Sequence, residues 1–193
     1  MIKITSAEFV KSATRPSEYP VTRVPEFAFF GRSNAGKSSL INMVVNRKSL
    51  VKTGSRPGMT RLVNFFLVNG AFSFVDLPGY GYAARSIREN EAFDRMLAEY
   101  ASLRENLRVV FFLMDMRRVP GEVERDSVAY FEGMGREVIL VGTKADKIGK
   151  NDVVKARRSW ASYFGTDPAS IIVTSAEKNT GRDEFLRAVS SRL

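Results

Sequence analysis

Short apolar segments alternate along the chain with segments in which apolar residues recur at helical spacing. Six runs rich in Val, Ile, Leu and Phe are only a few residues long and are flanked by polar or turn residues, which predicts β-strands. The later runs are apolar almost without interruption, as expected for strands buried on both faces of a parallel sheet. The predicted strands are Phe27–Phe30, Leu62–Val68, Phe72–Val75, Leu107–Met114, Val138–Val141 and Ile171–Val173.

Three segments between these runs carry apolar stripes that predict helices packed on the sheet. Alternation of strands and helices predicts an α/β fold with right-handed crossovers. The runs at 62–68 and 72–75 are separated only by the short Asn69-Gly70 turn, so we expect a hairpin and one antiparallel strand. The stripes consist of Leu40, Ile41, Val44 and Val45; of Phe93, Met96, Leu97 and Tyr100; and of Val153, Ala156, Trp160 and Phe164.

We therefore expect a three-layer α/β fold, with a six-stranded, mostly parallel sheet, one antiparallel strand in the hairpin at 62–75, and helices on both faces. The 193 residues contain no repeat or linker, which predicts one domain at 26–193 after a basic extension at 1–25. The N-terminus lacks a signal-peptide pattern, and the longest apolar run, Val109–Met114, is far shorter than the ~20 residues of a spanning helix. We expect a monomeric, cytoplasmic protein without stable membrane association.

Composition limits the chemistry that the chain can perform. It contains no Cys and no His, which excludes disulfides, zinc clusters, thiol nucleophiles and His-based catalysis, so any metal must be held by oxygen ligands. The formal net charge is +9, which favours a polyanionic partner. Residues 1–60 hold 10 Lys and Arg against 3 Asp and Glu, whereas residues 61–193 hold 20 against 18. Most of the positive charge therefore lies in the first third.

A phosphate-binding pattern, G-x-x-x-x-G-K-[ST], follows the first predicted strand and precedes a predicted helix. Its glycines let several backbone N–H groups converge on one phosphate, and the helix N-terminus adds positive potential. Lys37 would reach the terminal phosphates, and the Ser38 hydroxyl would bind Mg²⁺. The predicted nucleotide-binding residues are Gly31, Arg32, Ser33, Asn34, Ala35, Gly36, Lys37, Ser38 and Ser39.

Three further motifs follow later strands, where such sheets bind ligands. Asp76 would hold Mg²⁺ chiefly through water, and the Gly79 N–H would contact a γ-phosphate. Asp146 can accept two hydrogen bonds from guanine, whereas adenine offers no matching donor pair. The Lys144 stem would lie against the base. The predicted binding residues are Asp76, Leu77, Pro78 and Gly79; Thr143, Lys144, Ala145 and Asp146; and Thr174, Ser175 and Ala176.

Each later motif is weak alone, but their order and their places after strands resemble a small GTPase of the translation-factor-related class. The segments G-R-S-N-A-G-K-S-S-L-I-N at 31–42, R-P-G-M-T at 56–60, F-V-D-L-P-G-Y-G-Y-A at 74–83 and T-K-A-D-K at 143–147 resemble the EngB (YihA/YsxC) family of bacterial ribosome-biogenesis GTPases. This resemblance implies the P-loop GTPase fold and Mg²⁺-dependent GTP hydrolysis. It also implies a GTP/GDP switch in large-ribosomal-subunit assembly, with a link to cell division and septation.

The polar loop at 47–61 is expected to act as a switch. The Thr60 hydroxyl can complete the Mg²⁺ shell only when a γ-phosphate draws the loop inward. Lys37, Thr60 and Gly79 are therefore the expected catalytic residues. The resemblance also implies nucleotide contacts at Gly58, Met59, Thr60, Arg61 and Leu62.

Three positions bear on how well the chain binds and hydrolyses GTP. Thr143 replaces the usual Asn, and a hydroxyl cannot make all the hydrogen bonds of an amide, so weaker nucleotide binding is expected. Tyr80 stands where signalling GTPases place the Gln that orients water, which predicts slow hydrolysis stimulated by a partner. Asn34 is a candidate K⁺ ligand, and the alternative is that it only shapes the loop.

The expected partner is the large ribosomal subunit or its precursors, through rRNA or ribosomal protein. Alternatives are a P-loop small-molecule kinase, or a GTPase that acts on another RNA or at the membrane surface. Any single basic residue could equally be a solvated surface charge. The candidate RNA-contacting residues are Lys3, Lys11, Arg15, Arg23, Arg47, Lys48, Lys52, Arg56, Arg85 and Arg88.

Overall fold

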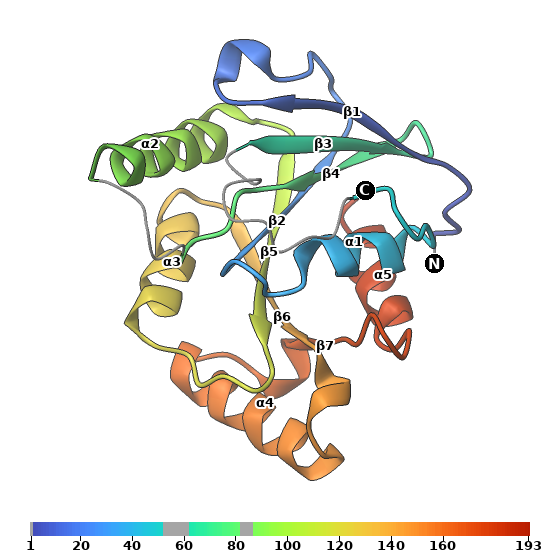
Figure 1. Cartoon of the computed structure of the whole chain (residues 1–193), viewed down its shortest axis with the longest axis vertical. Helices are drawn as coiled ribbons and strands as arrows, with labels where there is room; N and C mark the ends of the chain where they lie inside the picture. The colour runs from blue at the N-terminus through green and yellow to red at the C-terminus, as the bar shows by residue number, and fades with distance from the viewer. Residues whose placement is uncertain (1, 52–61, 82–86) are drawn as a thin grey trace.

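A computed structural model describes residues 2–51, 62–81 and 87–193, without the side chains of residues 87–89. Within these ranges the chain forms seven strands, five α-helices and three short 3₁₀ turns around one sheet (Figure 1). In chain order the elements are β1 (Ala7–Ala13), η1 (Pro16–Glu18), β2 (Glu26–Gly31), α1 (Lys37–Val44), β3 (Val63–Val68), β4 (Phe72–Asp76), α2 (Ile87–Leu103), β5 (Leu107–Asp115), α3 (Glu122–Gly133), β6 (Glu137–Thr143), η2 (Ala145–Lys147), α4 (Lys150–Phe164), η3 (Pro168–Ser170), β7 (Ile172–Val173) and α5 (Arg182–Ser190).

The strands lie in the order β1-β3-β4-β2-β5-β6-β7. Strand β3 pairs antiparallel with both β1 and β4, and the other neighbouring strands pair parallel. Therefore β3 is the one described strand that runs against the rest, which confirms the mostly parallel sheet and the hairpin at 62–75. The expected number of six strands is wrong, because β1 in the 1–25 extension adds a seventh.

The sheet is covered on both faces, which confirms the three layers (Figure 1). Successive residues of β2 point to opposite sides, because side chains alternate along a strand. Phe27 and Phe29 belong to the core under α1 and α5, whereas Ala28 and Phe30 belong to the core under α2, α3 and α4. The helical stripes predicted in α1, α2 and α4 are confirmed. The described helices α3 and α5 were not predicted, because each buries only two or three residues.

The 1–25 extension is fastened to the rest of the sheet. Its strand β1 covers the edge of β3, and the Phe9 ring packs edge-on against Phe66 with a centroid distance of 5.7 Å. Further along, Arg104 after α2 pairs with the fully buried Glu26 and donates a hydrogen bond of 3.2 Å to the Pro20 carbonyl. The extension thus forms part of the same hydrogen-bonded sheet. None of the described helices is long and apolar enough to cross a membrane.

Candidate nucleotide-binding site

The loop between β2 and α1 has a backbone that only glycine accommodates at its two ends. A Cβ atom at Gly31 would lie 2.3 Å from the Leu113 carbonyl oxygen, and Gly36 adopts a left-handed conformation directly before the helix. Within the loop, the Ala35 N–H donates to the Arg32 carbonyl over 2.9 Å. Because the first N–H groups of a helix lack partners within it, the start of α1 presents donors to an anion.

Lys37 and Gly79 meet at this loop, although they are far apart in the sequence. Lys37 is buried, and a Cβ atom at Gly79 would lie 3.0 Å from its Nζ atom. The same Cβ atom would lie 2.8 Å from the Gly31 carbonyl oxygen and 2.9 Å from the Ser33 nitrogen. Gly79 therefore needs to be glycine because the D-L-P-G segment passes directly against the phosphate loop.

Asp76 ends β4 with a buried carboxylate that suits a cation. Its Oδ1 atom is among the buried side-chain atoms of the described residues that have no hydrogen-bond partner. Burial raises the pKa of Asp76 to about 6, and the positive charge of Lys37 opposes this shift. Carboxylate and hydroxyl oxygens are the ligands that Mg²⁺ prefers, so Asp76 and the half-buried Ser38 at the start of α1 fit this ion. When bound, Mg²⁺ would neutralise charge on the nucleotide phosphates.

Other predicted contacts around the phosphates differ in where their side chains lie. Ala35 and Leu77 are buried in the core, so only their backbone can face a ligand. Leu62 lies just before β3. The predictions for Gly58, Met59, Thr60 and Arg61 lie outside the described residues.

The T-K-A-D and T-S-A segments meet at a cleft of about 210 Å³. Asp146 is held there by Ser175, whose hydroxyl donates to Oδ1 over 2.5 Å, and by Lys147 at 3.1 Å. The Ser175 hydrogen bond lowers the pKa of Asp146, so its carboxylate remains an ionised acceptor. The cleft is lined by Gly36, Ser39, Leu40, Thr143, Lys144, Asp146, Lys147, Thr174, Ala176 and Glu177.

Thr143 and Lys144 tie this cleft to the phosphate loop. The Thr143 hydroxyl lies 2.5 Å from the Ala35 carbonyl and 3.1 Å from the Met114 carbonyl. Its single proton can be donated to either of these two carbonyls. Lys144 donates from Nζ to the Asn34 carbonyl over 2.7 Å. Since the Thr143 proton is engaged with the backbone, this residue has no donor left for a base, unlike the two-donor amide of Asn.

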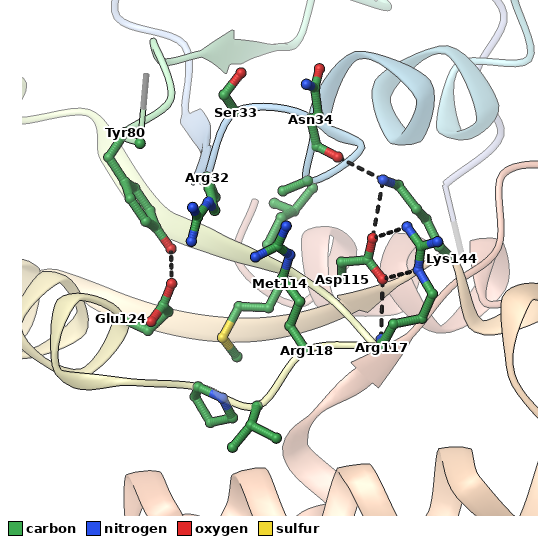
Figure 2. A pocket seen from close by; sticks show the side chains of 15 residues that line it. Arg32, Ser33, Asn34, Tyr80, Met114, Asp115, Arg117, Arg118, Glu124 and Lys144 are labelled. Atoms are coloured by element: carbon green, nitrogen blue, oxygen red, sulfur yellow. Dashed lines mark hydrogen bonds and ion pairs between the residues drawn. The ribbon is translucent and has the colours of Figure 1, made fainter. Parts of the chain in front are cut away.

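Tyr80 lies beside the phosphate loop but directs its hydroxyl to α3 (Figure 2). The hydroxyl donates to Glu124 over 2.9 Å, and the ring packs against both Phe30 and Phe112. Burial, with Glu124 adding to it, raises the pKa of Tyr80 well above its usual range. The phenol therefore stays protonated and cannot accept a proton from water. The sequence did not indicate a role for Glu124. Its one local interaction among the described residues is the hydrogen bond that its carboxylate accepts from the Gly121 N–H at the start of α3.

Comparison with known proteins agrees with this geometry. Residues 26–144 match the model of a family described as "50S ribosome-binding GTPase". The "Probable GTP-binding protein EngB" of Treponema denticola is 53% identical, with all of both chains covered. The protein of the same name from Desulfatibacillum aliphaticivorans is 45% identical over 96% of this chain and 91% of that one. The chain belongs to the EngB family of GTP-binding proteins.

Solved structures support the fold. A probable GTP-binding protein engB is 21% identical and has a TM-score of 0.66, covering 86% of this chain and 97% of that one. Era bound to MgGDPNP and nucleotides 1506–1542 of 16S ribosomal RNA is 21% identical and has a TM-score of 0.67. This match covers 88% of this chain and 57% of the Era chain. As a member of the EngB family, the chain binds GTP and GDP and has the fold of P-loop GTPases.

Proposed function

We propose that this protein is a GTP/GDP switch that acts in assembly of the large ribosomal subunit. The observation that carries the proposal is the match of residues 26–144 to a family described by binding to the 50S ribosome, in a chain that retains the phosphate loop and guanine cleft. The GTP-bound form would hold the subunit precursor, and hydrolysis would release it. A link to cell division and septation would then be indirect, through the supply of ribosomes.

GTP hydrolysis by the isolated protein is proposed to be slow. The residue at the usual Gln position, Tyr80, donates its hydroxyl proton to Glu124 and would therefore not orient the attacking water as a Gln does. Lys37 and the Gly79 N–H would stabilise charge on the terminal phosphate, and Mg²⁺ would supply further positive charge when bound. Stimulation would come from the ribosomal partner and from K⁺ held by Asn34.

The proposed RNA contacts are basic residues of the extension and of the segments around the switch loop. Arg15 already pairs with Glu18 over 2.9 Å, so part of its charge is neutralised within the chain. The predictions for Lys52, Arg56, Arg85 and Arg88 rest on side chains outside the described residues. Those with described side chains are Lys3, Lys11, Arg15, Arg23, Arg47 and Lys48. We propose a monomer that works in the cytoplasm without stable membrane association.

Co-sedimentation with large ribosomal subunits and their precursors tests this function. The protein should sediment with these particles more strongly with a non-hydrolysable GTP analogue than with GDP, and less strongly as salt rises, because phosphate contacts release counterions. The matched control is Lys37→Ala, which should lose tight nucleotide binding and with it the difference between the two nucleotides. Equal sedimentation of the wild-type protein in both nucleotide states would contradict the switch.

A further inference from the structure

A charged cluster next to the guanine cleft centres on Asp115, which no sequence motif singled out. Asp115 is the last residue of β5, and the parallel register places it directly opposite Thr143 on β6. Its side chain is only 6% exposed. The register therefore brings this carboxylate to the point where the T-K-A-D segment leaves the sheet, beside Lys144 (Figure 2).

Two cations share the Asp115 carboxylate. Arg117 donates from Nε to Oδ1 over 2.9 Å and from Nη2 to Oδ2 over 2.6 Å. The Lys144 Nζ atom lies 3.1 Å from the same Oδ2. Burial by itself would raise the pKa of Asp115, but hydrogen bonds from Arg117 and Lys144 outweigh burial and hold this pKa well below its usual range. The Asp115 carboxylate therefore remains ionised near neutral pH.

The Lys144 ammonium is held at a second point, the Asn34 carbonyl, 2.7 Å away. Both Lys144 and Asn34 have left-handed backbones, with φ of 57° and 63°, which are uncommon for residues other than glycine. With its backbone constrained and its Nζ atom fixed twice, the methylene stem of Lys144 has little freedom left. A free lysine would lose much rotamer entropy on ordering against a ligand.

We propose that Asp115 is a positioning residue for guanine-nucleotide binding: its carboxylate fixes the Lys144 ammonium against the phosphate loop and so preorders the stem on which the base lies. Asp115 is not among the residues that line the guanine cleft, and it acts through Lys144. Preordering removes an entropy cost from binding. The effect applies equally to GDP and GTP, which share the base.

A role for Asp115 only as the partner of Arg117 is the competing explanation. The Arg117 side chain is half exposed, and water would solvate its guanidinium without any carboxylate. Arg117 and Lys144 both line the neighbouring cavity of about 450 Å³ that reaches Tyr80, but of the two only Lys144 also lines the guanine cleft. Loss of the carboxylate should therefore be felt in nucleotide binding through Lys144, and loss of Arg117 should not.

The test is a double-mutant cycle with a fluorescent GDP and a fluorescent GTP analogue. Asp115→Asn should weaken both affinities about 10-fold, mainly through faster dissociation, and leave the preference for guanine over xanthine unchanged. In a Lys144→Met background the same change should have almost no further effect. The proposal would be overturned if Asp115→Asn lowered nucleotide affinity equally in the wild-type protein and in Lys144→Met. Thermal stability without nucleotide, measured on the same four proteins, reports separately the coupling of this ion pair in the nucleotide-free fold. Positioning requires a coupling in nucleotide affinity as well, whereas a purely structural pair would show coupling in stability alone.

Two further variants keep the proposal testable if Asp115→Asn leaves Arg117 unpaired and the chain unstable. Arg117→Gln should keep wild-type affinity, and adding Asp115→Asn to it should then lower affinity about 10-fold. The proposal would be overturned if Arg117→Gln lowered nucleotide affinity as much as Asp115→Asn does. It would also be overturned if adding Asp115→Asn to Arg117→Gln lowered the affinity no further. The matched control is Glu137→Gln at the other end of β6, which removes a carboxylate paired with Arg192 and should not change affinity.

Discussion

The Thr143 hydroxyl lies 2.5 Å from the Ala35 carbonyl, so the strand that ends at the guanine cleft is tied directly to the phosphate loop. Thr143→Val keeps the shape of the side chain and removes the donor, which leaves a buried carbonyl without its partner. We expect the free energy of unfolding to fall by about 1–3 kcal/mol and GDP affinity to fall about 10-fold. Chemical denaturation and nucleotide titration measure the two effects.

The control for this change is Thr166→Val, which removes an exposed hydroxyl that is hydrogen-bonded to Ser170 and does not line the cleft. It should change neither quantity measurably. Unchanged GDP affinity in Thr143→Val would show that the tie between cleft and loop is not needed for binding.

Asp146→Asn should convert the base preference from guanine to xanthine. The amide presents a donor where guanine needs an acceptor, and xanthine offers an oxygen at that position. We expect GDP affinity to fall by about 100-fold or more while XDP affinity rises. Glu177→Gln is the matched control, because Glu177 also lines the cleft but pairs with Lys147. The assignment of Asp146 is wrong if Glu177→Gln alters the preference between guanine and xanthine and Asp146→Asn does not.

Asp76→Asn should stabilise the nucleotide-free protein at pH 8 and not at pH 4. The pKa of Asp76 is raised from 3.8 to about 6, so between these values the folded chain keeps a proton that the unfolded chain has released. Raising the pH through this window therefore destabilises the folded state, by about 3 kcal/mol once the carboxylate is fully ionised. A neutral amide avoids this cost.

Thermal unfolding of wild-type and Asp76→Asn proteins across pH 4–8 measures the difference. The exposed residue Asp152 provides the control, since Asp152→Asn should give no such pH-dependent gain. A constant difference between wild type and Asp76→Asn at all pH values would contradict the raised pKa. The same variant should lose Mg²⁺-dependent nucleotide binding.

K⁺ should accelerate GTP hydrolysis several-fold over Na⁺ at equal ionic strength. The backbone carbonyl of Asn34 accepts a hydrogen bond from Lys144. The Asn34 side-chain amide points the other way, away from Asp115, so the amide oxygen is available to a cation (Figure 2). Asn34→Ala should abolish the difference between the two salts. Asn46→Ala is a fair control, because Asn46 also has a left-handed backbone but lies after α1. Equal wild-type rates in KCl and NaCl would remove K⁺ from the mechanism.

The sequence predicts those parts of the site that are formed by neighbours along the chain. The phosphate loop is one continuous turn, and its glycines are required by local backbone geometry at Gly31 and Gly36. Glu124 and Asp115 were not predicted, because their partners, Tyr80 and Lys144, lie far away in the sequence. Such pairs depend on which strands and helices become neighbours, and a single sequence does not specify that placement.

The missed strand β1 has a different cause. Phe9 and Val10 are 51% and 44% exposed, so an edge strand of this kind lacks the buried face that makes a strand recognisable. Helices α3 and α5 were missed because short stretches with two or three buried residues give little periodic signal. The strongly apolar central strands, by contrast, were located to within a few residues.

The edge position of β1 affects how the basic N-terminal segment should be studied. A shortened chain that starts at residue 26 would uncover Phe66 and leave the hydrogen-bonding groups of β3 open, and open edges invite self-association. Reduced ribosome binding by such a chain would report on aggregation as much as on missing charge. The contribution of Lys3 or Arg23 is therefore better measured by replacing the charge while the strand stays in place.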